Sequence, residues 1–369
     1  MIKDVPQRDR QVIEIDSEMS ISDAFGVLIT HNVLCAPVWD AQQGGYLGFF
    51  DVDDALNIAY DIDLLGGQSA EAVPRLKTSA VKVLDVFVKS NMIRNPEMDA
   101  PWIAVGPNVP MSEVLPILAS RARRVPVVDP ASGKVVKLLS QMDVVRHLHS
   151  TIQMSRPDEL PAFLAATSAS TGMGLQPVVV VTEDHEARDA FRAIIDHHVS
   201  AVGVVDEEGK LAACISNKDV QVVTMAAQAP AKAKPVVAPM MAAPSRARGR
   251  FSIASATVGS ASLFSMPCLM FVNEVRKRTE QGGRTHAAVV TAHAESTLKE
   301  IVDKLATTHH HRVFLVDLEH KPIGVVSVSD VCAVLADNVR EKKAPPPVPK
   351  RGGAPVAAAA EAAAADTAQ

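Results

Sequence analysis

The stretch HHHRVFLVDLEHKPIGVVSVSD, residues 309–330, decides the fold. It contains two apolar runs joined by a charged turn, which predicts a short β-hairpin. His311 and Arg312 precede the hairpin, and Ser327 and Asp330 follow it, where a helix is expected to begin. A buried core requires neither pair, whereas a phosphorylated sugar can use both.

The same pattern recurs three times upstream, in VLCAPVWDAQQGGYLGFFDVDDAL (33–56), RRVPVVDPASGKVVKLLSQMDVV (123–145) and VSAVGVVDEEGKLAACISNKDVQVV (199–223). Another strand and an amphipathic helix precede each hairpin. Ala187, Phe191 and Ile194, for example, recur at helical spacing. The chain is therefore expected to have an α+β fold, in which a β-α-β-β-α unit is present four times.

The repeats and the changes of composition between them predict the domain organisation. We expect four units, namely unit 1 (11–63), unit 2 (99–150), unit 3 (176–226) and unit 4 (286–338). The expected connections are a linker with a helix (64–98), a linker (151–175), a disordered linker (227–262), a short helix with its linker (263–285) and a disordered tail (339–369). The two disordered segments are rich in Pro and Ala and cannot bury enough apolar surface to fold alone.

The composition excludes several classes of protein. The formal net charge of −5 is spread along the chain, so no broad basic surface for nucleic acid is expected. The four cysteines have no zinc or disulfide spacing, which favours core residues in a reducing compartment. The N-terminus lacks a signal peptide and no stretch has transmembrane length, so we expect a cytoplasmic or nuclear protein without membrane contact.

The repeated unit, with its Gly-x-apolar-Ser/Thr-x-x-Asp ending, resembles the cystathionine β-synthase (CBS) domain. Four such units without a catalytic domain resemble the γ subunits of AMP-activated protein kinase and their sucrose-nonfermenting relatives. The resemblance implies two Bateman modules that close into a disc. It also implies regulatory binding of AMP, ADP or ATP for energy sensing, and a heterotrimer with a catalytic α and a scaffolding β subunit.

The candidate ligand residues follow from the chemistry of a nucleoside monophosphate, which offers a cis-diol and a dianion. A carboxylate at a helix start can accept both ribose hydroxyls, and basic side chains can hold the phosphate. The candidate ribose carboxylates are Asp54, Asp143, Asp219 and Asp330, beside the hydroxyls of Ser140, Ser216 and Ser327. The candidate phosphate groups are Arg123, Arg124, His197, His198, Lys218, His311 and Arg312. The resemblance adds Ser200 and Ser329, and Thr182 ends an entry strand.

Several motifs have a second interpretation. Ser-x-x-Asp before an apolar helix is close to a capping box, so each copy can serve only the helix end. Successive residues of the histidine run point to opposite faces of a strand, which disfavours one tetrahedral metal site. The acidic DVDD of residues 51–54 can bind magnesium or simply begin a helix. No catalytic motif is present, so neither an enzyme nor a catalytic cofactor is expected.

Unit 4 departs least from the family pattern, and the site of Asp330, His311 and Arg312 is expected to be the tightest. In unit 1, Asp51 replaces a usual hydroxyl and Leu34 a usual arginine, and both changes disfavour phosphate. The alternative function is a stand-alone protein of four units that binds adenylates or another ligand such as S-adenosylmethionine. Such a protein would regulate a phosphatase, a channel or a metabolic enzyme.

Overall fold

The computed structural model describes residues 12–54, 56, 83, 102–120, 122–221, 263–281 and 289–343. The linker expected at 227–262, the tail beyond residue 343 and, apart from Val83, the helix expected at 80–93 lie outside the described residues. Every predicted hairpin is present, and an α+β chain of four repeated units is confirmed.

Unit 4 shows the complete β-α-β-β-α order. Its elements are β9 (Thr291–Ala292), α12 (Leu298–Thr308), β10 (Arg312–Val316), β11 (Pro322–Ser327) and α13 (Val328–Lys343). Strand β10 pairs parallel with β9 and antiparallel with β11. Thr297 caps α12 through a reciprocal pair of bonds with Glu300, which satisfies amides that the helix leaves free. Helix α13 runs past residue 339, where the tail is predicted to begin, because Val339 still packs on the core and Arg340 pairs with Asp337.

The other units show part of this order among the described residues. Unit 1 contains β1 (Ile15–Asp16), α1 (Ile21–His31), β2 (Cys35–Asp40) and β3 (Gly45–Asp51). Unit 2 contains α5 (Met111–Ser120), β4 (Arg124–Val128), β5 (Val135–Ser140) and α6 (Gln141–Met154). Unit 3 contains β6 (Val180–Thr182), α8 (Ala187–Asp196), β7 (Ala201–Val205) and β8 (Leu211–Ser216). Helix α11 (Cys268–Gln281) precedes unit 4 at the position where a short helix is predicted.

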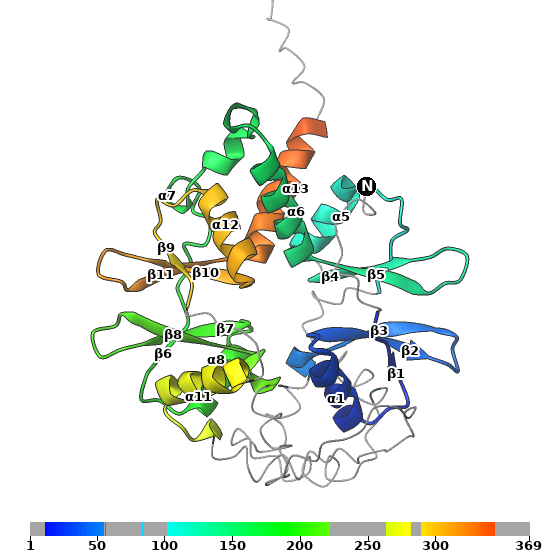
Figure 1. Cartoon of the computed structure of the whole chain (residues 1–369), viewed down its shortest axis with the longest axis horizontal. Helices are drawn as coiled ribbons and strands as arrows, with labels where there is room; N and C mark the ends of the chain where they lie inside the picture. The colour runs from blue at the N-terminus through cyan, green and yellow to red at the C-terminus, as the bar shows by residue number, and fades with distance from the viewer. Residues whose placement is uncertain are drawn as a thin grey trace, which may run out of the picture.

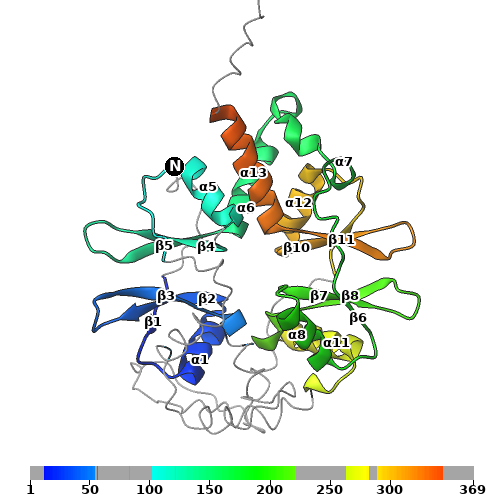
Figure 2. The same cartoon turned by 180° about the vertical axis from the view of Figure 1, so that it is seen from behind.

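Neighbouring units face each other through their sheets. Phe314 and Val316 on β10 of unit 4 pack against Leu211 on β8 of unit 3. Units 1 and 2 meet through an aromatic stack, in which the rings of Tyr46 and Trp102 lie 4.8 Å apart. Figures 1 and 2 show the two stacked pairs side by side. This pairing of units 1 with 2 and 3 with 4 confirms the predicted modules.

The two modules join through their helices. Helices α5 and α6 of unit 2 pack against α12 and α13 of unit 4. Units 1 and 3 share one apolar core, to which Phe25 and Phe191 both belong. The four units therefore occupy the four quadrants of a flat, disc-like assembly (Figure 1).

The connection between units 2 and 3 runs along unit 4. It contains η3 (Pro157–Glu159), η4 (Ala162–Ala165) and α7 (Ser168–Thr171), all within the segment predicted as a linker. The carbonyl of Gly174 then accepts a 2.8 Å hydrogen bond from the amide of Val325 on β11. A side chain at Gly174 would lie 2.5 Å from Val326 Cγ2, so only glycine fits this crossing without a shift.

None of the described helices is both long enough and apolar enough to cross a lipid bilayer. The four cysteines are unpaired thiols, and Cys35, Cys268 and Cys332 are buried. Burial raises the pKa of Cys35 to about 11 and that of Cys332 to about 12, so both thiols stay protonated. They behave as small apolar core residues.

Candidate ligand site where the four helix starts meet

The Ser-x-x-Asp segments lie at the inner ends of the four hairpins. The hairpin turns form the left and right edges of the molecule in Figure 1, and the opposite ends of the strands face its middle. Each segment links the second strand of a hairpin to the following helix. The fold therefore directs four helix starts, with the candidate residues on them, toward one central region.

All four segments cap their helices. In unit 4, Asp330 Oδ2 accepts hydrogen bonds from the amide and hydroxyl of Ser327, at 2.7 and 2.6 Å. Asp219 with Ser216 and Asp143 with Ser140 repeat both bonds. In unit 1 the amides of Asp51 and Asp54 each donate to the carboxylate of the other residue, at 2.8 and 3.0 Å. The capping interpretation of the motif is therefore correct at every copy.

Capping occupies one oxygen of each carboxylate, so the second oxygen distinguishes the four copies. Asp143 Oδ1 lies 3.7 Å from Arg146, and Asp54 and Asp219, both buried, have further interactions. For Asp330 Oδ1 there is no hydrogen-bond partner among the described residues. Of the four candidates, half-buried Asp330 has the capacity to accept further hydroxyl donors, as a ribose requires.

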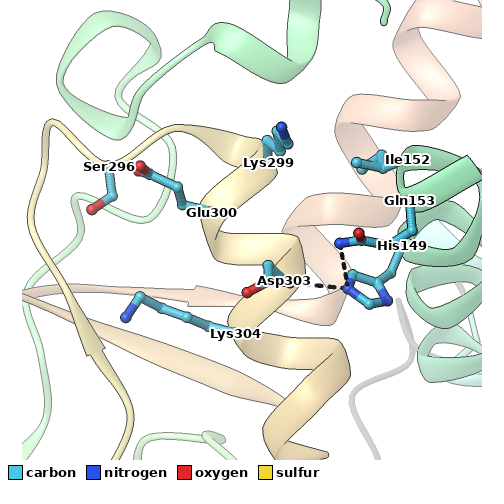
Figure 3. Close-up of a pocket in the computed structure, with 8 residues that line it drawn as sticks. All are labelled: His149, Ile152, Gln153, Ser296, Lys299, Glu300, Asp303 and Lys304. Carbon is cyan, nitrogen blue, oxygen red and sulfur yellow. Dashed lines mark hydrogen bonds and ion pairs between the residues drawn. The ribbon is translucent and has the colours of Figure 1, made fainter. Parts of the chain in front are cut away.

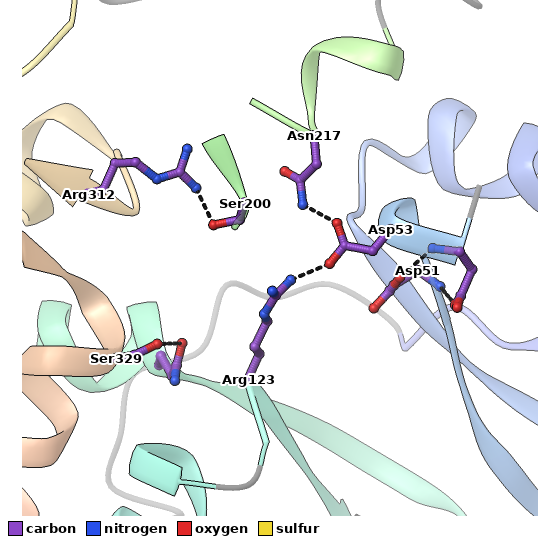
Figure 4. Close-up of polar contacts among 9 residues, drawn as sticks. Asp51, Asp53, Arg123, Ser200, Asn217, Arg312 and Ser329 are labelled. Atoms are coloured by element: carbon purple, nitrogen blue, oxygen red, sulfur yellow. Dashed lines mark hydrogen bonds and ion pairs between the residues drawn. The ribbon is translucent and has the colours of Figure 1, made fainter. Parts of the chain in front are cut away.

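Arg312 is held in place from unit 3. Its Nη2 donates a 2.7 Å hydrogen bond to Ser200 Oγ (Figure 4), and it also bonds the thiol of Cys214. Burial lowers the pKa of Arg312 below its ordinary value, while the Cys214 and Asp219 side chains oppose that change. A guanidinium ordered in advance loses less entropy when it binds an anion.

His311 lies among cationic side chains from three units. Desolvation by the surrounding protein and the neighbouring cations lower its pKa to about 3, although His311 is an exposed residue. The cations that act on it are Arg124 and Arg146 of unit 2, Lys218 of unit 3 and Arg312 of unit 4. Arg123 in turn acts on Arg312. We call these six residues, Arg123, Arg124, Arg146, Lys218, His311 and Arg312, the central cluster.

The central cluster is an environment suited to an anion. Like charges brought together in a partly desolvated region repel one another, and a phosphate dianion would offset that repulsion. Five of its six members are candidates from the sequence. Arg146 was missed because it lies inside helix α6, one turn beyond the capping segment.

Three further polar residues at the centre were also missed. Asp53 of unit 1 contacts Arg123 of unit 2 and Asn217 of unit 3 (Figure 4). Gln141 of unit 2 accepts a 3.2 Å hydrogen bond from Ser329 of unit 4. Asp53, Asn217 and Gln141 occupy the variable positions of Ser-x-x-Asp or its unit 1 counterpart, and that location is the signal that could have identified them.

The remaining candidates have less connection with the cluster. Thr182 Oγ1 bonds His185 Nδ1 at 3.0 Å in the turn after β6. His197 and His198 are exposed at the end of α8, where His198 has a left-handed backbone with φ of 53°. The carboxylates of Asp51, Asp53 and Asp54 in the DVDD segment all bind protein donors. The described residues contain no group of three potential metal ligands.

A groove of ≈ 510 Å³ lies elsewhere, between α6 and α12 (Figure 3). His149 and Asp303, 3.0 Å apart, cross it, and Lys299, Lys304 and Glu300 line it. Because charges of both signs alternate there, the groove offers no single ligand class a consistent set of partners.

Comparisons with known proteins agree with this architecture. The CBS domain family matches residues 2–61, 80–150, 175–222 and 285–337. The chain is 25% identical over 330 residues to 5'-AMP-activated protein kinase subunit gamma-3 of Bos taurus and 23% identical over 327 residues to that of Homo sapiens. Each alignment covers 88% of this chain but 56% of the relative, so the chain spans about half the length of these relatives.

Among solved structures, a protein of Methanocaldococcus jannaschii, described as a candidate archaeal homologue of the kinase γ subunit, superimposes with a TM-score of 0.60. The superposition covers 89% of this chain and 98% of that chain, at 14% sequence identity. At this identity the likeness concerns the fold, and it extends over most of the chain.

Proposed function

The chain belongs to the CBS domain family, and on that premise we propose that it is a non-catalytic regulator that binds an adenine nucleotide at the centre of its four units. AMP, ADP and ATP are the ligands, and they act as regulatory signals rather than as cofactors. The principal site is in unit 4. The observation that carries the proposal is Arg312 of unit 4, held by Ser200 of unit 3 and opposite Ser327 in the hairpin, beside Asp330, one oxygen of which has no hydrogen-bond partner among the described residues.

The roles of the residues follow from their chemistry. Asp330 Oδ1 accepts the ribose hydroxyls while Oδ2 continues to cap α13. Arg312, fixed by Ser200, meets the phosphate together with Lys218 and Arg124. The dianion also interacts with the N-terminal end of α13, where helix dipoles favour negative charge.

We further propose that the regulated enzyme is a Ser/Thr protein kinase of the AMP-activated type. The similarity to gamma-3 subunits supports this partner, which would consist of a catalytic α and a scaffolding β subunit in the cytoplasm or nucleus. A ligand regulates the assembly only to the extent that it binds one arrangement of it more tightly than another. Recovery of both subunits with the tagged full chain from cell extract is the expected result, and their absence would contradict the kinase assignment.

The second candidate is a stand-alone regulator that binds an adenosyl ligand. It is favoured by the length of chain, residues 222–262, that separates the described part of unit 3 from α11 and unit 4. S-adenosylmethionine carries a sulfonium cation instead of a phosphate, so the central cluster should disfavour it.

Calorimetric titration of the full chain with AMP, ADP, ATP and S-adenosylmethionine tests the proposed ligand class. Saturable binding of at least one nucleotide, with no binding of S-adenosylmethionine, is expected. The reverse preference would favour the second candidate, and failure of all four ligands would remove the nucleotide-binding function.

A further inference from the structure

Asp53 connects three of the four units. Its Oδ2 pairs with Arg123 Nη1 of unit 2, and its Oδ1 accepts a hydrogen bond from Asn217 Nδ2 of unit 3 (Figure 4). Arg123 lies at the inner end of the unit 2 hairpin and acts electrostatically on Arg312. A carboxylate of unit 1 thus binds a cation of the central cluster.

The position of Asp53 within its unit can be compared with the equivalent position in the other three units. The residues directly before the capping carboxylate are Asp53, Met142, Lys218 and Ser329 in units 1 to 4. Lys218 is itself a member of the central cluster, and Ser329 bonds Gln141 across the interface of units 2 and 4. The same position in unit 1 places a negative charge directly on Arg123, a member of the central cluster.

A carboxylate and a phosphate present the same kind of acceptor to a guanidinium. Both accept charge-assisted hydrogen bonds from it. A terminal nitrogen that already pairs with a carboxylate has fewer N–H donors left for an incoming phosphate. The side chain of Arg123 is 55% exposed and that of Asp53 is 29% exposed, so solvent and ligand can reach the pair. An external anion can therefore compete with Asp53.

We propose that Asp53 is a built-in competitor of the ligand phosphate, which occupies Arg123 and lowers the affinity of the centre for phosphorylated ligands. The inference rests on the proposed placement of the phosphate at the central cluster. It also identifies a selectivity determinant, because repulsion by Asp53 increases with the charge of the ligand. Displacement of Asp53 from Arg123 would loosen the link among units 1, 2 and 3, which connects ligand binding to unit arrangement.

The test compares Asp53→Asn with a matched change, Asp337→Asn. Each substitution removes one negative charge that pairs with an arginine, but Asp337 pairs with Arg340 at an exposed position well beyond the start of α13. Thermal shifts are measured with orthophosphate and pyrophosphate, and AMP binding is measured by calorimetry. Since the ion pair is partly exposed, we expect Asp53→Asn to tighten phosphate and AMP binding roughly three- to tenfold, with a larger gain for pyrophosphate.

A second pair of variants identifies the partner. Addition of Arg123→Gln to Asp53→Asn should abolish the gain, whereas Asp337→Asn should leave phosphate affinity within about twofold of the wild type. Equal affinities of Asp53→Asn and the wild type for phosphate and AMP would overturn the inference, as would an equal gain in Asp337→Asn. If Asp53→Asn gains phosphate binding but no variant binds AMP, the proposed function fails and the inference stands.

Discussion

Arg312 of unit 4 donates a 2.7 Å hydrogen bond to the hydroxyl of Ser200 of unit 3. The contact crosses the sheet interface of the second module and joins residues separated by 112 positions. It orders a long cationic side chain before any ligand arrives, so the central cluster is prepared by the packing of one unit on another.

Replacement of Arg312 by glutamine should weaken AMP binding roughly ten- to hundredfold, because a charged donor to the phosphate is lost. Ser200→Ala keeps the charge and loses only the positioning bond, so a decrease of roughly two- to fivefold is expected. Calorimetry measures both. Arg340→Gln, which breaks only a surface ion pair with Asp337, is the control. Equal affinities of Arg312→Gln and Arg340→Gln would exclude Arg312 from the site.

The protonation of His311 should affect stability in acid. Its pKa is about 3 in the folded chain, whereas an unfolded histidine titrates near 6.5. Between these values the unfolded chain binds the additional proton, so the contribution of neutral His311 to stability is lost as the pH falls below about 6.5. We expect the melting temperature of His311→Gln to fall less between pH 7.5 and 5.0 than that of the wild type. His147→Gln, at an exposed position on α6, should behave like the wild type. Equal decreases of the melting temperature in the wild type and both variants would show that His311 does not cause the loss of stability in acid.

Ligand binding should be linked to the same proton. A phosphate beside His311 offsets the surrounding cations and raises its pKa from about 3, so protons are taken up on binding and the contribution of His311 to AMP affinity should grow as the pH falls from about 6.5 to about 4.5. The phosphate of AMP titrates in this range as well, but it does so equally in His311→Gln. Calorimetric titrations should therefore show a smaller loss of AMP affinity on acidification for the wild type than for the variant. Equal slopes would place the phosphate away from His311.

Two glycines in the connection between units 2 and 3 form a matched pair. Gly172 and Gly174 have φ of 74° and 73°, but only a side chain at Gly174 would collide with Val326 and the carbonyl of Val325. Gly172→Ala should destabilise the chain by about 1 kcal/mol through its backbone, and Gly174→Ala by roughly 1–3 kcal/mol more. Urea denaturation followed by circular dichroism compares them. Equal destabilisation would show that the chain at Gly174 and β11 can shift to accommodate a side chain without cost.

The local elements were predictable because their signals are local. The hairpin at 309–330 is a run of neighbouring residues, and Ser327 and Asp330, three positions apart, mark the start of α13. The repetition of the pattern made the four units recognisable, and the family resemblance supplied the pairing of units into modules. The exact end of α13 was less predictable, since the helical residues up to Lys343 give way to a Pro-rich sequence without a capping signal.

The contacts between units could not be derived from the sequence. Asp53 and Asn217 are separated by 164 positions, and Gln141 and Ser329 by 188. Nothing in the neighbourhood of Asp53 distinguishes a solvated acidic helix start from a residue that binds Arg123. The fold alone brings these side chains together, and it also leaves Oδ1 of Asp330 without the partner that Arg146 provides to Asp143.

The central claim is that Asp330 binds ligand in addition to capping α13, and one calorimetric comparison tests it most directly. AMP is titrated into the wild type, Asp330→Ala and Thr297→Ala; the last loses a comparable helix cap in the same unit, away from the central cluster. Both variants should lose about 1 kcal/mol of stability. We predict that Asp330→Ala alone weakens AMP binding, by at least roughly tenfold. Wild-type affinity in Asp330→Ala would show that the carboxylate is a helix cap and nothing more.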